Sequence, residues 1–319
     1  MKSVLVPLAL VVLLQPVHAT TSNVLPLRVQ SALAHRSIPD SNLSIYVENL
    51  SRKEVVLAWN ADRPRTPASV VKLLTTLVAL DKLGPTYTWK TDLYLRGELK
   101  DGTLHGDLLL KGYGDPYLVT ERMWQLQRRL RQLGVRRIDG DLLLDDSWFE
   151  VGDYDPAAFD REPLRAYNVE PNALMANYKV VRYLFTPDPN GSGVRIELEP
   201  PLDNVQIINQ LAIGNGACRG YQRGIAIAPN DSFDKFIFSG RFPGGCREYS
   251  MGRTALSHNA YTFGLFKSLW EESGGELTGG WKRVQLPEGL KPDLSFDSPP
   301  LAEIISKVNK HSNNVMARQ

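Results

Sequence analysis

The sequence has few of the residues that bind metals and no excess of one charge. Its 319 residues include five histidines and two cysteines, and the formal net charge is +2. The histidines are scattered and no His-Glu-x-x-His motif occurs, so we expect neither a metal site nor a cofactor. The nearly neutral charge gives no electrostatic basis for binding nucleic acid. Hydrophobic residues make up 43% and charged residues 23%, as in a globular protein of two or three domains.

No hydrophobic run is long enough to span a membrane. The apolar run Val4–Leu14 follows the positive Lys2 and leads to Ala19, in the pattern of a cleaved signal peptide over residues 1–19. An N-terminal core strand is the alternative, but the polar Thr20–Asn23 follows at once. We therefore expect an exported chain, in the periplasm or outside the cell, with no transmembrane segment after cleavage.

Only two cysteines occur, Cys218 and Cys246. In an exported protein a lone pair is expected to be oxidised, and turn residues and β-formers surround both positions. We predict a disulfide across a hairpin or sheet corner. Two buried free thiols are the alternative.

The most informative stretch predicts a helix that begins after residue 66. Thr66 suits a capping position and Pro67 the first helical position. Leu73–Leu80 is apolar almost all the way round, a pattern typical of a helix buried in a core. Gly84 and the proline after it end the helix.

Ser69 and Lys72 lie three residues apart at the start of this helix, so they share one face. A serine hydroxyl becomes a nucleophile when a neighbouring base takes its proton, and desolvation lowers the pKa of a lysine toward that role. A Ser-x-x-Lys match is expected about once by chance in a chain of this length. Ser232 and Lys235 match too, but there the pattern predicts a turn followed by a strand, which would separate the two side chains.

Alternation and turn residues predict the remaining elements. A helix over Val24–His35 and a hairpin of Leu43–Glu48 with Val55–Asn60 precede Ser69. The following segments are predicted as strands at Thr91–Leu99 and Gly106–Lys111, a helix at Thr120–Leu133, a strand pair within Val135–Asp145, short strands within Val205–Tyr249, and helices at Ser257–Trp270 and Leu301–Asn309.

Ser312 and Asn314 follow the last predicted helix. Two residues apart in an extended or loop segment, their side chains would lie on one side, where a hydroxyl can relay a proton and a carboxamide can hold a peptide. A polar helix terminus is the alternative. Ser257 and Asn259 have the same spacing, but there we expect helix capping.

The order of these pieces resembles the penicillin-recognising serine acyltransferases. Within them it is similar to the class C D-alanyl-D-alanine carboxypeptidase/endopeptidase family, whose large insertion accounts for the long separation between Lys72 and Ser312. Tyr113 stands where the family has a glycine, and Asn313 stands where aspartate is common. The resemblance covers nearly all the mature chain and is carried by Ala68–Leu74, Gly112–Pro116, Tyr167–Leu174 and Lys310–Ala317.

The resemblance implies an α+β fold. Residues 20–88 and 252–319 would form a β-lactamase/transpeptidase-like catalytic domain with an antiparallel sheet and helices. Residues 89–251 would form a large, mainly β insertion of one or two subdomains that contains the cysteine pair.

The resemblance also implies a reaction on peptidoglycan peptides, with β-lactam antibiotics as covalent inhibitors. Ser69 would attack the carbonyl of a D-alanyl peptide bond and Lys72 would accept the proton. Ser312 would relay the proton to the leaving amine, and Asn314 would hold the peptide. Carboxypeptidase and endopeptidase activity both fit.

The family's Lys-Thr-Gly box does not occur in the sequence. We therefore expect a C-terminally truncated chain that lacks the final part of the sheet and has low or no activity. The alternatives are an acyl hydrolase of the β-lactamase or esterase type, and a cell-wall binding protein without catalysis.

Overall fold

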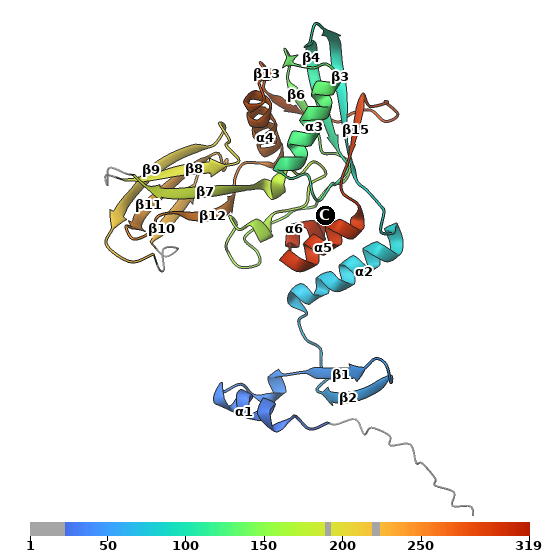
Figure 1. Ribbon diagram of the computed structural model, residues 1–319, viewed down its shortest axis with the longest axis vertical. Coiled ribbons are helices and arrows are strands. Elements are labelled where there is room, and N and C mark those ends of the chain that lie inside the picture. The colour runs from blue at the N-terminus through green and yellow to red at the C-terminus, as the bar shows by residue number, and fades with distance from the viewer. Residues whose placement is uncertain (1–22, 189–192, 219–223) are drawn as a thin grey trace, which may run out of the picture. The chain divides into compact units, whose positions relative to one another are not determined.

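The computed structural model describes residues 23–188, 193–218 and 224–319, which form two compact units that divide between Ala68 and Ser69 (Figure 1). The predicted signal peptide, residues 1–19, lies outside the described residues. None of the helices in the described ranges is both long enough and apolar enough to cross a membrane.

The first unit contains one helix, α1 (Leu27–His35), and the antiparallel hairpin of β1 (Ile45–Asn49) and β2 (Glu54–Trp59). The predicted helix and hairpin are confirmed. Leu25 and Leu57 are its buried apolar residues in the described range.

The second unit contains a seven-stranded sheet. Its strands are β3 (Lys90–Lys100), β4 (Thr103–Gly112), β5 (Arg137–Ile138), β6 (Leu142–Asp145), β13 (Glu276–Leu277), β14 (Trp281–Arg283) and β15 (Leu294–Asp297). The strands pair in the order β13-β5-β4-β3-β15, with β6 on β4 and β14 on β6. This sheet combines residues from both sides of the expected domain boundary at 251/252, and the boundaries themselves stay a prediction.

Two helices lie beside this sheet, α3 (Thr120–Gln132) and α4 (His258–Glu272) (Figure 1). Met123, Leu126 and Leu130 of α3 are fully buried in the main core. Leu133 was expected on the same stripe but is 41% exposed, because the helix ends one residue before it. Ser257 caps α4 by accepting a hydrogen bond from the N–H of Ala260, as predicted.

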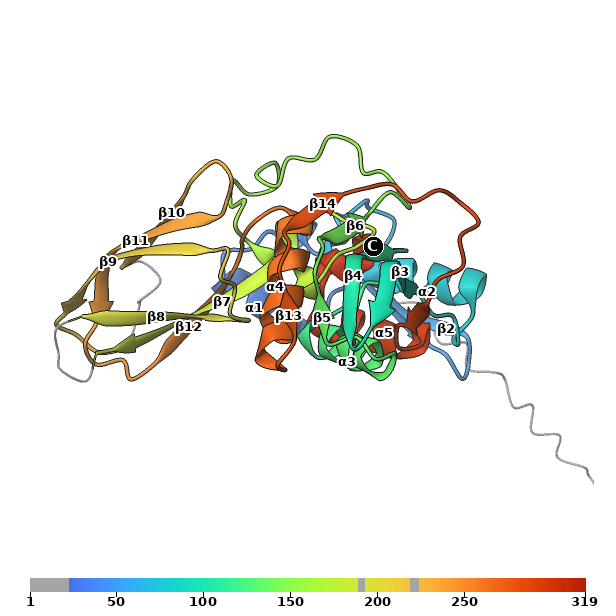
Figure 2. The ribbon, with the colours of Figure 1, turned by 90° about the horizontal axis from the view of Figure 1, so that it is seen from above.

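Two three-stranded sheets form a second layered body, seen edge-on in Figure 2. One sheet has β7 (Val180–Pro187) between β12 (Tyr249–Thr254) and β8 (Val194–Glu199), and the other has β11 (Lys235–Pro243) between β10 (Ile225–Pro229) and β9 (Gln206–Gly214). Aromatic rings join the layers, with the Tyr183 and Phe238 ring centroids 5.0 Å apart.

The cysteine pair lies in this body. Cys218 and Cys246 form a disulfide, which confirms the prediction and excludes two free thiols. Lys235 begins β11 directly after a turn, so the second Ser-x-x-Lys match has the turn-and-strand structure predicted for it.

The second unit also contains three helices outside these sheets: α2 (Val71–Leu83), α5 (Leu301–His311) and α6 (Asn314–Arg318). Both α5 and α6 pack against α2. Leu301, Ile304 and Val308 are the buried residues of α5, which accounts for most of its predicted apolar stripe.

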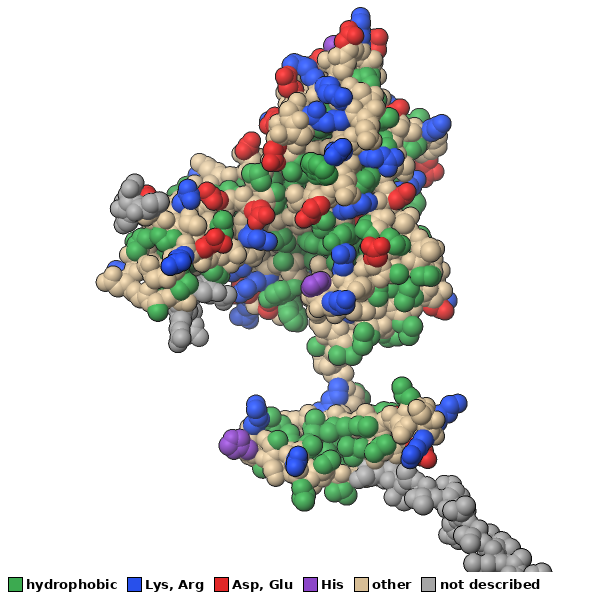
Figure 3. Space-filling view, in the orientation of Figure 1, with side chains coloured by type: hydrophobic (Ala, Val, Ile, Leu, Met, Phe, Trp, Pro, Cys, Tyr) green, Lys and Arg blue, Asp and Glu red, His purple; other side chains and the backbone are tan. Residues whose placement is uncertain are grey.

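The prediction that α2 is buried in a core is wrong. Its buried residues are the polar pair Lys72 and Thr76, whereas Leu73, Leu74 and Leu77 are each about 60% exposed. A helix that is apolar all round does not reveal which face packs, and here the narrow polar line faces α5 and α6. Within the described part of its own unit, no element covers the apolar side, and hydrophobic side chains gather over α2 in Figure 3.

Candidate active site

Ser69 lies in a short 3₁₀ turn, Ala68–Val70, that leads into α2. The α-helix begins at Val71, so the expected start after a Thr66 cap is wrong. Ala68 has a φ of 45°, in the left-handed region, and a right-handed helix cannot run through it. The turn leaves Ser69 exposed at the end of α2.

Lys72 joins Ser69 to a distant part of the chain. Its Nζ lies 3.1 Å from Ser69 Oγ and 2.5 Å from Asn314 Oδ1, and the residue is only 6% exposed. The amine therefore points at the serine hydroxyl and away from solvent. In both contacts the Lys72 amine is the donor, to the serine hydroxyl and to the asparagine carbonyl.

A corner between α5 and α6 brings Asn314 to this position. Ser312 ends α5 with a φ of 52°, which turns the chain sharply. Asn313 then caps α6 by accepting a hydrogen bond from the Met316 N–H at 3.1 Å. Asparagine and aspartate cap equally well, which explains why asparagine is tolerated at the middle position of the Ser-x-Asn box. Asn314 is the first residue of α6.

A hydrogen bond from the last turn of α5 also connects this corner to α2. Asn309 Nδ2 donates to Thr76 Oγ1 at 3.1 Å, and Thr76 Oγ1 donates to the Lys72 carbonyl at 2.8 Å. Thr76 and Asn309 were not singled out in the sequence. The signal that could have found Thr76 is its spacing, since it lies four residues after Lys72 on the same helix face.

Ser312 is brought near this group but is not bonded to it. Its side chain is exposed, and within the described chain its hydroxyl makes no hydrogen bond to Ser69 or Lys72. Of the extended or loop segment that was expected, the structure has a short loop: Ser312 is left-handed, and Asn314 already begins α6.

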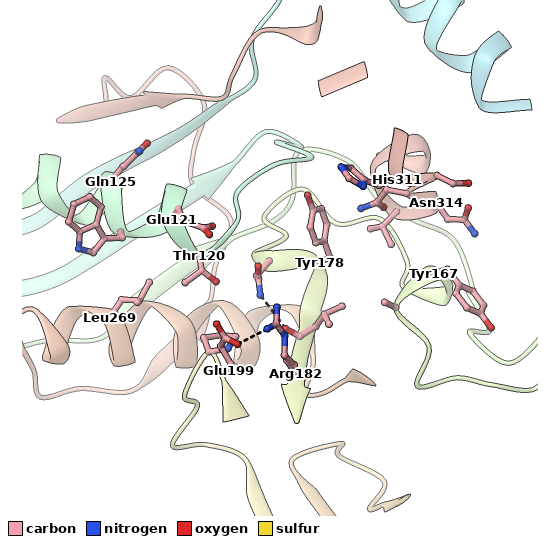
Figure 4. A pocket seen from close by; sticks show the side chains of 18 residues that line it. Thr120, Glu121, Gln125, Tyr167, Tyr178, Arg182, Glu199, Leu269, His311 and Asn314 are labelled. Carbon is pink, nitrogen blue, oxygen red and sulfur yellow. Dashed lines mark hydrogen bonds and ion pairs between the residues drawn. The ribbon is translucent and has the colours of Figure 1, made fainter. Parts of the chain in front are cut away.

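A cavity of about 860 Å³ lies beside the α5–α6 corner (Figure 4). Its walls come from the start of α3, from β7 and the end of β8, from α4, and from residues 311–315. Ser312 and Asn314 belong to its lining, and Ser69 and Lys72 do not. Side chains of both charges are mixed over the face of this unit that Figure 3 shows.

A serine, a buried lysine and an asparagine are thus joined by hydrogen bonds where α6 packs on α2. The sequence profile of the D-Ala-D-Ala carboxypeptidase 3 (S13) family matches residues 25–319. The chain belongs to this family.

Two curated relatives are similar to this S13 chain. D-alanyl-D-alanine carboxypeptidase DacB of Haemophilus influenzae is 23% identical over 295 residues, which are 90% of this chain and 60% of the relative. The D-alanyl-D-alanine carboxypeptidase of Actinomadura sp. is 26% identical over 267 residues, which are 78% of this chain and 47% of the relative. The chain thus spans about half to three fifths of the length of these relatives.

Solved structures confirm the predicted α+β, penicillin-recognising type of fold. The crystal structure of penicillin binding protein 4 (dacB) from Haemophilus influenzae matches with a TM-score of 0.73 and 21% identity, over 91% of this chain and 64% of that one. The same protein complexed with a novel beta-lactam matches with a TM-score of 0.64 and 20% identity, over 85% and 58% of the two chains.

Arg318, the last residue of α6, and Gln319, which follows it, contact residues 154–172 of this S13 chain. Gln319 pairs with the backbone of Asn172, donating from Nε2 to the carbonyl at 2.7 Å and accepting from the N–H at 3.2 Å. Arg318 donates to the Tyr154 hydroxyl at 2.8 Å and to the Tyr167 carbonyl at 3.1 Å. These contacts were missed because no local pattern links residues about 150 positions apart.

Two stretches that carry the family resemblance meet in the same place. The Gly114 N–H donates to the Ala173 carbonyl at 2.8 Å, and a Cβ on Gly112 would lie 2.1 Å from that same carbonyl oxygen. Glycine at position 112 therefore permits the close approach of residues 112–116 to residues 167–174. Tyr113, the departure from the family pattern, points its ring toward Lys90, whose Nζ lies 4.4 Å from the ring centroid.

Buried charges hold residues 167–174 from the other side. Glu170 Oε1 lies 3.2 Å from both Lys179 Nζ and His258 Nε2. Burial by itself would raise the pKa of Glu170, but the His258 hydrogen bond and the Lys179 charge lower that pKa to about 2. Burial also lowers the pKa of His258. Glu170 thus stays ionised across the physiological pH range.

Proposed function

We propose that this chain carries the acyl-transfer site of a serine-type D-Ala-D-Ala carboxypeptidase/endopeptidase that acts on peptidoglycan peptides. One observation carries the proposal: Lys72 Nζ contacts both Ser69 Oγ and Asn314 Oδ1. These two residues lie near opposite ends of the sequence of the second unit. Membership of the S13 family supports this class of reaction. The chain covers only part of its relatives, so the activity of the whole protein is part of the proposal.

The first half of the reaction forms an acyl-enzyme. Ser69 Oγ attacks the carbonyl carbon of the D-alanyl peptide bond, and its proton passes to the neutral amine of Lys72. The oxyanion that forms accepts a hydrogen bond from the Ser69 backbone N–H. The C–N bond then breaks as the leaving amine takes up a proton that passes from Lys72 through the Ser312 hydroxyl. Water hydrolyses the Ser69 ester by the same proton path in reverse.

Asn314 has two roles in this scheme. Its Oδ1 orients the Lys72 amine, and its Nδ2 group is then free to donate to the carbonyl of a bound peptide. The gap between Ser312 and Lys72 is consistent with a relay that the substrate's leaving amine completes, because catalytic hydrogen bonds are often long before substrate binds.

The same site would react covalently with β-lactam antibiotics, because the opened ring remains attached to Ser69 as an ester. We also propose that the chain is exported to the periplasm or outside the cell. The Cys218–Cys246 disulfide supports export, since such bonds persist in oxidising compartments.

Labelling with a fluorescent penicillin tests the nucleophile. Ser69→Ala should abolish labelling and leave the circular dichroism spectrum unchanged. Ser232→Ala is the matched control, since Ser232 and Lys235 have the same spacing in a turn and strand. That variant should be labelled like the unaltered chain. Labelling that persists in Ser69→Ala would contradict the assignment.

The rate of labelling also tests the effect of the missing Lys-Thr-Gly box. By resemblance, the strand of that box supplies the second oxyanion N–H, and loss of one such donor costs about 10²–10³ in rate. We therefore expect the 319-residue chain to be labelled slowly. Fast labelling followed by fast release of the adduct would favour a β-lactamase or esterase, and reversible binding without an adduct would favour a non-catalytic cell-wall protein.

A further inference from the structure

A second cavity lies in the same unit, and neither Ser69 nor Lys72 belongs to its lining. Its walls come from β3, from β4 and the Tyr113 that follows it, from Ser147 and Trp148 after β6, and from residues 285–290 after β14. No residue lines both this cavity and the one beside the α5–α6 corner. Its volume of about 340 Å³ is at the small end of the range for ligand sites, roughly 300–1,000 Å³. That size suits one unit of a longer chain.

Three aromatic side chains line this second cavity: Tyr94, Tyr113 and Trp148. The rings of Tyr113 and Trp148 meet edge to face, with their centroids 4.9 Å apart. Trp148 is nevertheless 60% exposed. An indole is a large apolar group, and tryptophan is enriched at binding surfaces because it supplies contact area and a polar handle together. The contact with Tyr113 orients Trp148, so the two rings form a platform that a ligand can pack against.

The positive charge in the lining is already neutralised. Lys111 Nζ lies 3.1 Å from Asp145 Oδ2, and the two side chains are only 11% and 0% exposed. Asp145 also accepts hydrogen bonds from Ser147 Oγ at 2.6 Å and from the Leu286 N–H at 2.9 Å, both of which belong to the wall. Glu288 is the other charged residue of the lining, and it is exposed and makes no ion pair to the described residues. The described lining therefore offers no free cation to an anionic ligand.

The polar groups that remain in the wall are uncharged. The Gln285 side chain is exposed and makes no hydrogen bond to the residues that the structure describes, so its donors and its acceptor are available. A sugar ring has C–H faces that pack on aromatic rings and a rim of hydroxyl and amide groups that form hydrogen bonds. An aromatic platform with neutral polar groups beside it matches such a ring.

We propose that this second cavity binds an uncharged sugar unit of a glycan chain. Trp148 and Tyr113 pack against the face of the ring, and Gln285 forms hydrogen bonds with the groups at its rim. The inference rests on the proposed function, because the peptides of peptidoglycan are attached to a glycan of N-acetylated sugars. The cavity holds that glycan while Ser69 acts on the peptide. By resemblance the family has a glycine at position 113, so we expect this site in the present chain and not throughout the family.

Titration with a tetramer of N-acetylglucosamine tests the site, because this probe is uncharged and carries no peptide. Calorimetry should show saturable binding to the unaltered chain. Trp148→Ala and Tyr113→Gly should each weaken that binding about tenfold, through loss of an aromatic ring from the platform. Tyr113→Phe keeps the ring and should bind the tetramer like the unaltered chain. Trp281→Ala is the matched control, because Trp281 is an exposed tryptophan that lines neither cavity, and it should leave the affinity unchanged.

The deacetylated tetramer, in which each ring carries an ammonium group, tests the argument from charge. It should bind no more tightly than the acetylated tetramer, and Glu288→Gln should leave the affinity for the acetylated tetramer unchanged. Tighter binding of the ammonium probe that Glu288→Gln abolishes would show a cation site and overturn the proposal. Absence of saturable binding of the acetylated tetramer, or an unchanged affinity in both Trp148→Ala and Tyr113→Gly, would also overturn it.

Penicillin labelling separates this inference from the proposed function. Trp148→Ala should be labelled at Ser69 at the unaltered rate, which also shows that the variant is folded. Loss of sugar binding with labelling intact is the result that the second cavity predicts for this variant. Failure of penicillin to label the unaltered chain would instead overturn the proposed reaction, and the sugar titration would still decide whether the cavity binds a glycan.

Discussion

Lys72 is the residue through which two distant parts of the chain meet. A lysine amine is a compact group at the end of a flexible stem, so its position depends on what it contacts. Here burial and two oxygen partners define that position, with Ser69 in the 3₁₀ turn that leads into α2 and Asn314 on α6. The helical spacing accounts for the first contact, and only the fold accounts for the second.

Asp115 is another buried ionisable residue, and only one of its two carboxyl oxygens has a hydrogen-bond partner among the described residues. Its Oδ1 accepts a hydrogen bond from the Tyr117 N–H at 2.8 Å, while Oδ2 is buried without a hydrogen bond to the described residues. Burial raises the pKa of Asp115 to about 6, although the Tyr117 N–H and the Arg122 charge oppose the shift. Folding therefore shifts the protonation equilibrium of Asp115 toward the protonated form.

This pKa predicts a particular pH dependence of stability. The unfolded chain releases the Asp115 proton near pH 4 and the folded chain near pH 6, so the contribution is full below pH 4 and is lost as the pH rises to about 6. The loss is at most about 3 kcal/mol. Urea unfolding should show that Asp115→Asn gains stability relative to the unaltered chain between pH 4 and pH 7. A difference that does not change with pH would contradict the prediction.

At the scale of the elements, the corner between α5 and α6 is the part that positions the site. A five-residue helix such as α6 is not stable by itself, so its orientation must come from tertiary contacts. Asn313 caps one end and Gln319 holds the other end to the backbone of Asn172. Asn172 is held in turn by Asp146, which accepts from its Nδ2 at 3.0 Å.

Gln319→Ala should loosen α6 at the end away from Asn314. Loss of its two hydrogen bonds should lower the free energy of unfolding by about 1–2 kcal/mol and slow penicillin labelling of Ser69. Gln132→Ala is the control, because Gln132 is exposed at the end of α3 and makes no side-chain hydrogen bond to the described residues. Equal labelling rates in the two variants would show that the contact with Asn172 does not position Asn314.

At the scale of the whole molecule, most of the hydrophobic core of the second unit lies away from the site. The main cluster of buried residues runs from the seven-stranded sheet through α3 and α4 into the layered body of β7–β12. The site lies at the separate packing of α2 on α5 and α6, which has its own small cluster around Ile304, Val308 and Met316.

Because the main core and the site are separate, we expect the disulfide to stabilise the fold without affecting the reaction of Ser69. The Cys218–Cys246 bond closes a loop over a sequence separation of 28 residues, for which the chain-entropy estimate is about 3–4 kcal/mol. The double variant Cys218→Ser, Cys246→Ser should unfold at lower urea concentration and still be labelled by penicillin at 20 °C at the unaltered rate. A proportional loss of labelling in the folded variant would couple the layered body to the site.

Local signals were enough for much of the fold. Periodicity and capping residues located α3, α4 and α5, and the spacing of Ser69 and Lys72 predicted their contact. The predicted signal peptide and the single pair of cysteines together predicted the disulfide. The failures came where a local pattern was compatible with several surroundings. For α2 the apolar composition correctly predicted a helix. It did not predict that Thr76 is buried in place of Leu73, because that depends on the helices that pack against α2.

The sequence by itself determined which side chains could do the chemistry, because helical spacing and residue type are local properties. It also determined the family, through motifs that lie far apart along the chain. Only the tertiary structure decided that Asn314 reaches Lys72, that Ser312 remains exposed beside a cavity, and that Gln319 holds α6. Those three results depend on contacts between segments more than 100 residues apart, and a local pattern carries no information about which distant segment will arrive.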